Sequence, residues 1–468
     1  MRIVLADLAS ADGFVSKDTV AGGYGSRLRP FSKTAAMVCM VKRRLHAPPS
    51  VQMAYLAALA AARGHDTRWT SGGSVESVEG DVAIVLSSLV DYRHETAWAD
   101  ELRRRGTRVG FVGLAASKMP ELFMDHADFV VAGEPEEAIG RMFDGEELRG
   151  FVQSAPLDNL DELPFPRWDL LGGSSNRTRT GRLTVRPLGG GFPVLASRGC
   201  PEFCTYCPHR ILADHRARSI ANIMEELEAL SEIYPHPYVI FRDPLFSEDR
   251  ERCLALCEAI LSRGIRLRFE CETRLDRLDP ALLSIMYRAG LRAMSFGVES
   301  VATDTLKKAG RRPIPPQHQR AVVDFCRELG IATAAFYVFG FVQDTWSSIA
   351  HTIDYAINLG STFAQFKILT PYPGTPLWKQ MKPLVYEQDW EKFDGFTPTF
   401  THPNLTAGEL MFLLGAAYSR FYIRPTYVAN HLGIQSTMIR DMLTRLDTRV
   451  FARQARHEIL VASRAVSC

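Results

Sequence analysis

The sequence lacks the features of several common protein classes. Its apolar runs fall short of the roughly 18 residues that a membrane span needs, and its N-terminus, MRIVLADLAS, has no signal-peptide cleavage site. Lys and Arg number 55 and Asp and Glu 53, so the net charge of +2 gives no electrostatic basis for binding nucleic acid. We therefore expect a cytoplasmic protein whose partner is a small molecule rather than a membrane or a nucleic acid.

The sequence has few cysteines, and most of them follow no regular spacing. Six of the nine cysteines are scattered, as free thiols are in a reducing compartment. These six are Cys39, Cys253, Cys257, Cys271, Cys326 and Cys468. Cys253 and Cys257 lie one helical turn apart, and we interpret them as buried helix residues.

The remaining three cysteines stand together in the run SRGCPEFCTYCPH. Cys200, Cys204 and Cys207 follow the apolar stretch 192–196, which places three thiols on one short loop after a strand. A closed structural zinc site needs four ligands, whereas an iron–sulfur cluster held by three cysteines leaves one iron open to a substrate or cofactor. A zinc knuckle completed by His209 and three unrelated core cysteines are the alternatives.

The C-x3-C-x2-C spacing closely resembles the signature of the radical S-adenosylmethionine (SAM) superfamily. The resemblance implies a [4Fe-4S] cluster whose open iron binds SAM and passes it one electron. The products would be methionine and a 5′-deoxyadenosyl radical that abstracts hydrogen from an unactivated carbon. An electron donor such as flavodoxin or ferredoxin is implied as a partner.

A chain of 468 residues is too long for one hydrophobic core, so we expect more than one domain. The predicted strands alternate with predicted helices, which indicates the α/β fold class. Residues 1–150 predict a Rossmann-like parallel sheet, and residues 151–187, which lack periodicity, predict a linker. Residues 188–400 predict a partial (β/α)6 TIM-type barrel with its active site at the carboxyl ends of the strands. Residues 401–468 are expected to form a helical C-terminal cap.

The apolar pattern also predicts the individual elements. Strands are expected at 3–7, 81–89, 108–113, 129–132, 193–197, 238–243, 267–272, 293–298, 333–339 and 365–370. Helices are expected at 50–63, 95–105, 220–233, 250–262, 280–289, 318–329, 407–421, 426–432 and 436–446.

Polar residues and one glycine follow the predicted barrel strands. Taken singly, each is as typical of a helix cap or a surface ion pair as of a ligand. Over residues 192–376, however, these runs resemble the corresponding segments of radical SAM enzymes. The resemblance implies that Tyr206 and Gly340 lie near adenine, Asp243 near the SAM ammonium, and Glu272, Arg274, Glu299 and Ser300 near its ribose or carboxylate.

Residues 40–170 resemble the cobalamin-binding half of one radical SAM branch, whose usual task is the methylation of unreactive carbon. Ser87-Ser88-Leu89 fits the S-x-L element of that branch, and Gly113 stands where a pair of glycines begins. The second glycine is replaced by Leu114, whose side chain would crowd the place where a corrin's nucleotide tail approaches the backbone. The D-x-H-x-x-G motif is missing, since Asp7 is followed by LASADG.

A long insertion, DGFVSKDTVAGGYGSRLRPFSK, follows the first strand. Loops of this length are usually functional, and this one leaves from the carboxyl end of the strand, where ligands bind. Its run Gly22-Gly23-Tyr24-Gly25 offers an anion nest, and a flexible surface loop is the alternative. We hypothesise that the insertion and Leu114 fill the corrin space. On that hypothesis the first domain is a vestigial cobalamin-binding domain that helps to cover the barrel. Binding of cobalamin is therefore doubted.

Without cobalamin the radical must act directly on the substrate. The arrangement resembles the radical SAM diol dehydratase of aminoglycoside-antibiotic biosynthesis, which implies a sugar or aminosugar substrate. Loss of water needs an acid, a base and carboxylates that hold ammonium groups. The catalytic candidates are Glu270, His209, Tyr337 and Lys367. Glu270 shares strand parity with Glu272, so both are expected to point inward, and Lys367 has a structural ion pair as its alternative role.

Three other functions compete with this hypothesis. A cobalamin-dependent C-methyltransferase of secondary metabolism is the main alternative. A methylthiotransferase needs a second three-cysteine cluster, and the N-terminal region has only Cys39. An iron–sulfur or zinc-binding regulator would have no use for the polar residues at the strand ends.

Overall fold

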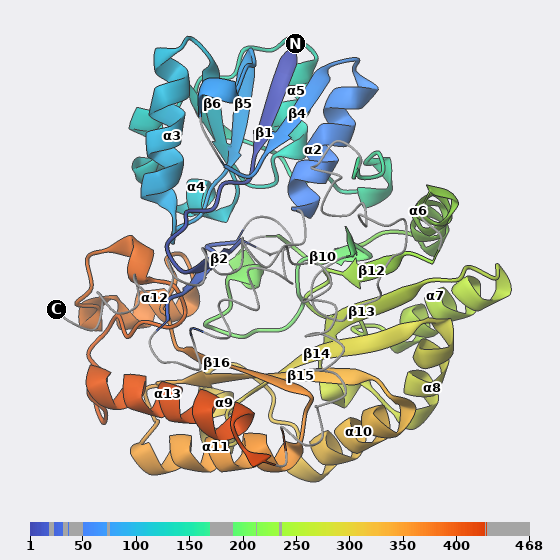
Figure 1. Ribbon diagram of the computed structural model, residues 1–468, viewed down its shortest axis with the longest axis vertical. Helices are drawn as coiled ribbons and strands as arrows, with labels where there is room; N and C mark the ends of the chain where they lie inside the picture. The colour runs from blue at the N-terminus through green and yellow to red at the C-terminus, as the bar shows by residue number, and fades with distance from the viewer. Residues whose placement is uncertain are drawn as a thin grey trace, which may run out of the picture.

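The computed structural model of the protein describes residues 1–17, 23–30, 50–72, 75–168, 191–211, 213–233 and 236–425, together with Ala36 and Tyr427. Two six-stranded parallel sheets form the molecule, and Figure 1 shows the N-terminal sheet standing above the C-terminal one. Within the described ranges, no helix has the length and apolarity required to cross a bilayer. The expected α/β class, with a Rossmann-like unit and a partial barrel, is confirmed.

The N-terminal sheet has the strand order β4-β1-β5-β6-β7-β8, and every pair is parallel. Its strands are β1 (Arg2–Ala6), β4 (Asp66–Thr70), β5 (Val82–Leu86), β6 (Arg108–Val112), β7 (Phe129–Ala132) and β8 (Gly150–Gln153). The two edge strands, β4 and β8, lack a continuous apolar run because each is partly exposed, and the sequence pattern missed both. Strand β8 lies within the segment expected to be a linker, and residues 169–190 of that segment fall outside the described residues.

Helices cover both faces of this sheet. They are α2 (Val51–Ala62), α3 (Tyr92–Arg104), α4 (Leu114–Lys118) and α5 (Glu136–Phe143). Helices α3 and α4 pack on one face, whereas α2 and α5 pack on the other. Helix α2 is apolar around most of its circumference, so it can be buried on several sides at once. It therefore lies in one continuous hydrophobic core that extends from this sheet into the barrel.

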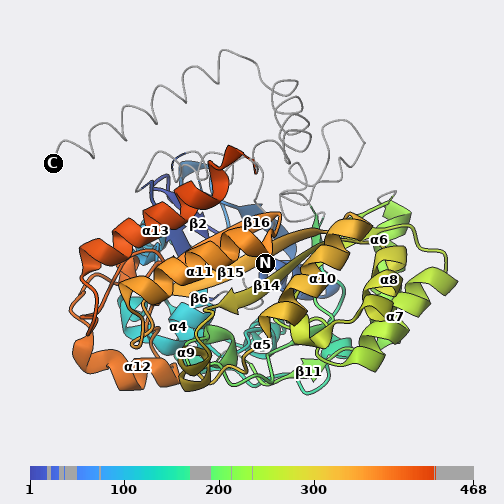
Figure 2. The ribbon, with the colours of Figure 1, turned by 90° about the horizontal axis from the view of Figure 1, so that it is seen from below.

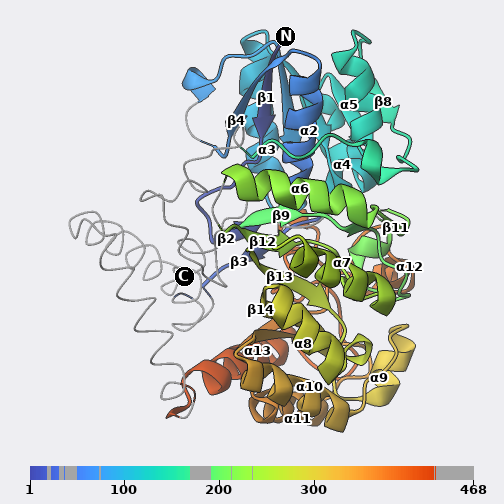
Figure 3. The same ribbon diagram turned by 90° about the vertical axis from the view of Figure 1, so that its right-hand side faces the viewer.

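The C-terminal sheet is an open half-barrel with the strand order β16-β15-β14-β13-β12-β9. Its strands, all parallel, are β9 (Phe192–Val194), β12 (Tyr238–Phe241), β13 (Arg268–Thr273), β14 (Leu291–Glu299), β15 (Ala332–Phe339) and β16 (Phe363–Ile368). The helices on its outer side, visible in Figure 3, are α6 (Ile220–Ile233), α7 (Arg250–Ser262), α8 (Pro280–Ala289), α10 (Pro316–Leu329) and α11 (Trp346–Leu359).

Shorter elements join the two sheets and line the barrel mouth. Two antiparallel pairs are formed, by β2 (Phe14–Ser16) with β3 (Ser26–Leu28) and by β10 (Ser197–Arg198) with β11 (Arg216–Ala217). Helices α9 (Thr303–Lys308) and α12 (Pro376–Met381) follow strands β14 and β16. Single 3-10 turns lie at Val75–Ser77, Pro120–Leu122, Met124–His126, Leu160–Glu162, Pro208–Ile211, Leu275–Arg277, Lys382–Leu384 and Trp390–Lys392.

The last described helix, α13 (Ala407–Tyr422), closes the free edge of the half-barrel at β16. Figure 2 shows it running beside α11. The Tyr418 hydroxyl donates to Phe366 O (3.0 Å) and accepts from Phe366 N (3.3 Å), and Tyr422 makes the same pair of bonds with Ala364. These bonds satisfy backbone groups that an edge strand leaves unpaired. Of the further C-terminal helices expected, only Tyr427 lies within the described residues.

This edge closure predicts an effect on stability. Replacing the buried Tyr418 by Phe leaves the Phe366 backbone groups without partners and should cost about 1–3 kcal/mol of unfolding free energy. Tyr386→Phe is the matched control, because that half-exposed hydroxyl donates to Pro398 O (2.8 Å) and water can replace it. Denaturant unfolding of both variants measures the difference, and equal losses would contradict the assignment.

Candidate active site

The cysteine motif forms a pinned loop at the carboxyl end of the first barrel strand. Its three cysteines, Cys200, Cys204 and Cys207, are free thiols, with Cys204 buried and the other two half-buried. Thr205 N donates to Ala309 O (2.9 Å), and Leu377 N donates to Thr205 O (3.0 Å). The loop is thus held between the end of α9 and the start of α12.

The three thiols interact with one another as members of one site. Burial raises the pKa of Cys207 to about 12, and the neighbouring Cys204 acts in the same direction. Burial also raises the pKa of Cys200, again with a contribution from Cys204. The raised pKa values of Cys200 and Cys207 fit a site where a bound metal displaces the thiol protons.

The donor set fits an iron–sulfur cluster better than a zinc knuckle. A cluster spreads its three ligands over three irons, whereas zinc draws its ligands around one point. In the part of the chain that the structure describes, no three or more His, Cys, Asp or Glu residues gather closely enough to hold a single metal ion. His209 stands on the short turn directly after the loop, and its catalytic role stays a prediction.

Arg311 links the cysteine loop to the end of strand β14. Its Nη1 lies 3.7 Å from Cys204 Sγ, and its Nη2 donates to Gly297 O (2.5 Å) and lies 3.6 Å from Glu299 Oε1. Nothing in the sequence singled out this arginine, because its partners come from distant segments. Its position brings a positive charge against the thiols that would carry negative charge once a cluster is bound.

Glu299 is held in an uncommon backbone conformation at the end of β14. Its φ of 64° lies in the left-handed region, which non-glycine residues seldom adopt outside special sites. Burial raises the pKa of Glu299, whereas Arg311 and a hydrogen bond from Tyr206 act in the opposite direction. The structure therefore brings together Tyr206 and Glu299, two of the residues predicted to bind SAM.

Tyr206 also reaches the loop after β15. Its ring packs edge-on against Phe341, with the ring centroids 5.6 Å apart. The adjacent Gly340 has a φ of 92°, and its N–H and that of Phe341 both donate to Asp344 (2.9 and 3.0 Å). Tyr206 and the residue next to Gly340 thus form one aromatic contact, and the nearness of Tyr206 and Gly340 to an adenine stays a prediction.

The carboxylate of Asp243 is engaged by neighbouring groups of the chain. The residue is buried, Oδ1 accepts from Ser197 Oγ (2.5 Å) and Oδ2 accepts from Ala196 N (3.1 Å). These contacts shape the segment that leads into the cysteine loop. Contact with the SAM ammonium stays a prediction.

Arg274 and Ser300 also have partners within the chain. Arg274 binds Asp276 through two nitrogens (3.0 Å each), and its Nη1 lies 3.8 Å from Glu202 on the cysteine loop. The Ser300 hydroxyl accepts from Ala302 N (3.1 Å). Arg274 therefore helps to hold the loop, and direct contact of either residue with SAM stays a prediction.

Two carboxylates of β13 face the barrel interior. Along β13, Phe269, Cys271 and Thr273 are buried and alternate with the partly exposed Glu270 and Glu272, so the predicted parity of the two glutamates is confirmed. Glu270 accepts from the Tyr238 hydroxyl (2.8 Å), and Glu272 lies 3.3 Å from Arg242.

Lys367 faces the same interior from β16. Among the described residues it makes no ion pair, and its Nζ lies over the Phe396 ring at 5.8 Å. Burial lowers the pKa of Lys367, whereas Asp394 and Glu272 act in the opposite direction. The alternative role of Lys367 as a member of a structural ion pair is therefore not seen.

The prediction that Tyr337 faces the barrel mouth is wrong. Tyr337 is fully buried, its ring stacks on Phe366 at 5.1 Å, and its hydroxyl has no hydrogen-bond partner among the residues that the structure describes. Side chains alternate along β15, so Phe336 and Val338 are the residues that face inward. Tyr337 belongs to the hydrophobic core between the sheet and its helices.

A comparison with known families identifies this site. Residues 194–356 match the family model described as Radical SAM superfamily. Residues 194–356, which include the cysteine loop, are therefore a radical SAM domain. A radical SAM domain implies a [4Fe-4S] cluster and SAM, and the three thiols on the pinned loop are the residues that would hold the cluster.

Two curated relatives have names that point to methyl transfer. The "uncharacterized methyltransferase PH0819" of Pyrococcus horikoshii is 29% identical over 65% of this chain and 70% of its own length. The bacteriochlorophyllide d C-12(1)-methyltransferase of Chlorobaculum tepidum is 26% identical over 70% of this chain and 72% of its own length. These relatives favour the methyltransferase alternative over the dehydratase expected from the sequence.

Two solved structures share the whole two-domain fold. TsrM of Kitasatospora setae, a radical SAM methyltransferase with cobalamin and a [4Fe-4S] cluster bound, matches 89% of this chain and 90% of its own with 15% identity and a TM-score of 0.61. The cobalamin-dependent enzyme OxsB, with aqua-cobalamin and SAM bound, matches 98% of this chain and 71% of its own with 12% identity and a TM-score of 0.65. At these identities the likeness shows the fold alone.

The chain does not fit the nucleotide tail of cobalamin at the S-x-L element. The Ser87 hydroxyl donates to Val112 O (2.8 Å) and accepts from Ala116 N (2.9 Å), so it has no proton left for a ligand. Leu114, in place of the second glycine, is 1% exposed and packs in the core that Tyr24 also enters. The neighbours' cobalamin is therefore not carried over to this chain.

The thiols of the pinned loop should decide the iron content. Cys204→Ala removes one of the three ligands and should lower the iron retained after anaerobic reconstitution severalfold. Cys326→Ala, a buried cysteine of α10 far along the chain, is the matched control and should keep the iron of the unaltered protein. Iron and sulfide analysis of both proteins tests this, and equal iron contents would contradict the ligand assignment.

Proposed function

We propose that the protein uses radical SAM chemistry to abstract hydrogen from a polar small molecule held inside the half-barrel. The observation that carries this proposal is the loop with three thiols, pinned at the barrel mouth beside Arg311 and Glu299. Cluster and SAM, when bound, supply a 5′-deoxyadenosyl radical. The chain contributes ligands and an interior that keeps the radical away from bulk water.

Methyl transfer is the reaction that we propose first. Two curated relatives that align with roughly two thirds of this chain are named methyltransferases, and these names support the proposal. The acceptor would be a carbon of the small molecule that lies between the cysteine loop and the inward-facing side chains of β13 and β16. Hydrogen would leave the acceptor carbon as part of 5′-deoxyadenosine, and a second SAM would supply the methyl group. One electron from the reduced donor would balance this step, in which the new carbon–carbon bond forms and S-adenosylhomocysteine is released.

Dehydration of a vicinal diol is the second candidate, and the charged side chains on the inner face of β13 and β16 favour it. The radical would take hydrogen from the carbon that bears one hydroxyl, and the neighbouring hydroxyl would leave with a proton as water. One electron from the reduced donor and one proton would then convert the carbonyl radical to the ketone or aldehyde. Lys367 and the Tyr238–Glu270 pair are the groups placed to move these protons.

The substrate of either reaction is proposed to be a sugar or aminosugar. Glu270 and Glu272 offer carboxylates to ammonium or hydroxyl groups, and Gln365 lines the same face of β16 as Lys367. The electron donor would be a flavodoxin or a ferredoxin.

Product analysis separates the two reactions. The reduced, reconstituted protein is incubated with SAM whose methyl group carries deuterium, together with a panel of aminosugars. Methyl transfer places the label in a product and also forms S-adenosylhomocysteine, whereas dehydration forms 5′-deoxyadenosine and an unlabelled product that lacks one oxygen. Failure to cleave SAM with an intact cluster would overturn both.

Lys367 provides a prediction for the substrate side of the site. Lys367→Met should leave 5′-deoxyadenosine formation in the absence of substrate within about twofold, while product formation falls by about a hundredfold or more, the usual size of a proton-transfer effect. Lys379→Met, on the exposed side of α12, is the control. Equal loss of both activities in Lys367→Met would place the lysine at the SAM site instead.

A further inference from the structure

The crevice beyond strands β1 and β5 is the place where the N-terminal sheet should bind a ligand. In an open parallel sheet, ligands bind beyond the carboxyl ends of the strands at the point where the strand order reverses. The order β4-β1-β5 puts this switch point between β1 and β5. Figure 1 shows that the carboxyl ends of both strands point toward the barrel.

The insertion after β1 occupies this crevice with a buried ion pair. Lys17 Nζ lies 2.7 Å from Glu95 and donates to Leu86 O (3.1 Å), at the end of β5. Both charged side chains are at most 3% exposed. Glu95 also accepts from the hydroxyl (2.6 Å) and the N–H (2.9 Å) of Ser88, in the S-x-L element itself.

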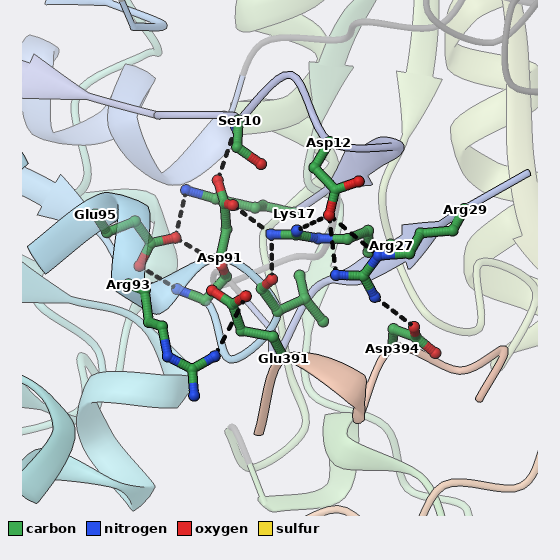
Figure 4. Close-up of polar contacts among 12 residues, drawn as sticks. Ser10, Asp12, Lys17, Arg27, Arg29, Asp91, Arg93, Glu95, Glu391 and Asp394 are labelled. Atoms are coloured by element: carbon green, nitrogen blue, oxygen red, sulfur yellow. Dashed lines mark hydrogen bonds and ion pairs between the residues drawn. The ribbon is translucent and has the colours of Figure 1, made fainter. Parts of the chain in front are cut away.

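A second buried charge of the insertion is satisfied in the same place. Arg27, at 3% exposure, bonds to Val90 O and Asp91 and lies 2.7 Å from Asp12, as Figure 4 shows. The neighbouring Gly25 is packed so tightly that a Cβ on it would stand 2.9 Å from a methyl group of Val90. Gly25 of the insertion therefore packs directly against Ser88 and Val90.

The insertion also reaches the barrel. The Tyr24 hydroxyl donates to Pro373 O (2.6 Å), and its ring stacks on Tyr372 at 5.3 Å with the planes 9° apart. Arg27 N donates to Asp394 O (3.4 Å), in the segment that follows the last barrel strand. Tyr24, Leu114 and Phe393 share one hydrophobic core.

We propose that the insertion, through Lys17, Tyr24 and Arg27, permanently fills the switch-point crevice, so that the N-terminal domain binds no corrin there and serves as the roof of the barrel. Withdrawing the insertion would leave Glu95 buried without its cation, which is strongly unfavourable. It would also break the contacts that hold residues 372–394 over the barrel mouth. This inference does not depend on which reaction the barrel performs.

Cobalt retention tests the inference directly. The full-length protein with its cluster reconstituted is incubated anaerobically with excess hydroxocobalamin, desalted and analysed for cobalt and for the corrin spectrum. We expect iron and sulfide in the ratio of the cluster and no cobalt above background. Stoichiometric cobalt after desalting would overturn the proposal.

The buried ion pair supplies a second test, which reports on the insertion itself. Lys17→Met should lower the melting temperature by several degrees, and adding Glu95→Gln should restore most of the loss because the buried carboxylate is gone while a partner for Ser88 remains. Arg104→Met, which breaks an exposed ion pair with Glu101, is the matched control and should change little. If Lys17→Met behaves like the control, the insertion is not a permanent part of the fold.

If Lys17→Met fails to fold, the double variant Lys17→Met/Glu95→Gln is compared with the unaltered protein instead. Folding of the double variant would support the proposal, whereas failure of both variants to fold would contradict the pairing of Lys17 with Glu95. The single variant Tyr24→Phe, which removes only the bond to Pro373 O, should fold and lower the melting temperature by a smaller amount. An unchanged melting temperature in Tyr24→Phe would count against the contact with the barrel.

Discussion

The immobilisation of the cysteine loop is the constraint on which the rest of the structure depends. A cluster held by three thiols has to meet SAM in one geometry, because the radical acts only on what lies within contact distance. Backbone bonds of Thr205 and the guanidinium of Arg311 fix the loop against segments that follow β14 and β16. The half-barrel therefore brings these segments together at the carboxyl ends of its strands.

The N-terminal domain also contacts the barrel and the segment that follows β16. A continuous core joins it to the barrel through α2, and the insertion after β1 extends its contacts to the segment after β16. The solved neighbours show that this two-domain arrangement occurs with cobalamin bound. In this chain, side chains of the insertion after β1 are buried beyond the ends of β1 and β5, and we propose that they replace the cofactor there.

Local signals in the sequence were sufficient for most of the fold. The expected helix at 280–289 has the bounds of α8, because Asp279 caps its first turn and Gly290 ends it. Strand parity predicts the inward position of Glu270 and Glu272, whereas Tyr337 lies in the core because the inward positions of β15 belong to Phe336 and Val338. The sequence pattern does not predict the edge strands β4 and β8, because each is only partly buried and has no continuous apolar run.

The site was less predictable where it depends on contacts between distant segments. The motif itself identifies the three thiols, whereas the contact of Arg311 with Cys204 and the pairing of Lys17 with Glu95 arise only once the chain has folded. The same holds for Asp243, whose carboxylate is engaged by neighbours on the preceding strand and its loop. Residue type and position along a strand did not reveal these partners.

The central claim is that three thiols present an open iron to SAM at the barrel mouth. Electron paramagnetic resonance of the reduced, reconstituted protein, recorded with and without SAM, tests it most directly. We predict a [4Fe-4S]⁺ signal whose g values shift when SAM is added, because SAM binds the iron that lacks a cysteine. A signal that SAM leaves unchanged, from a protein with full iron and sulfide content, would contradict the claim.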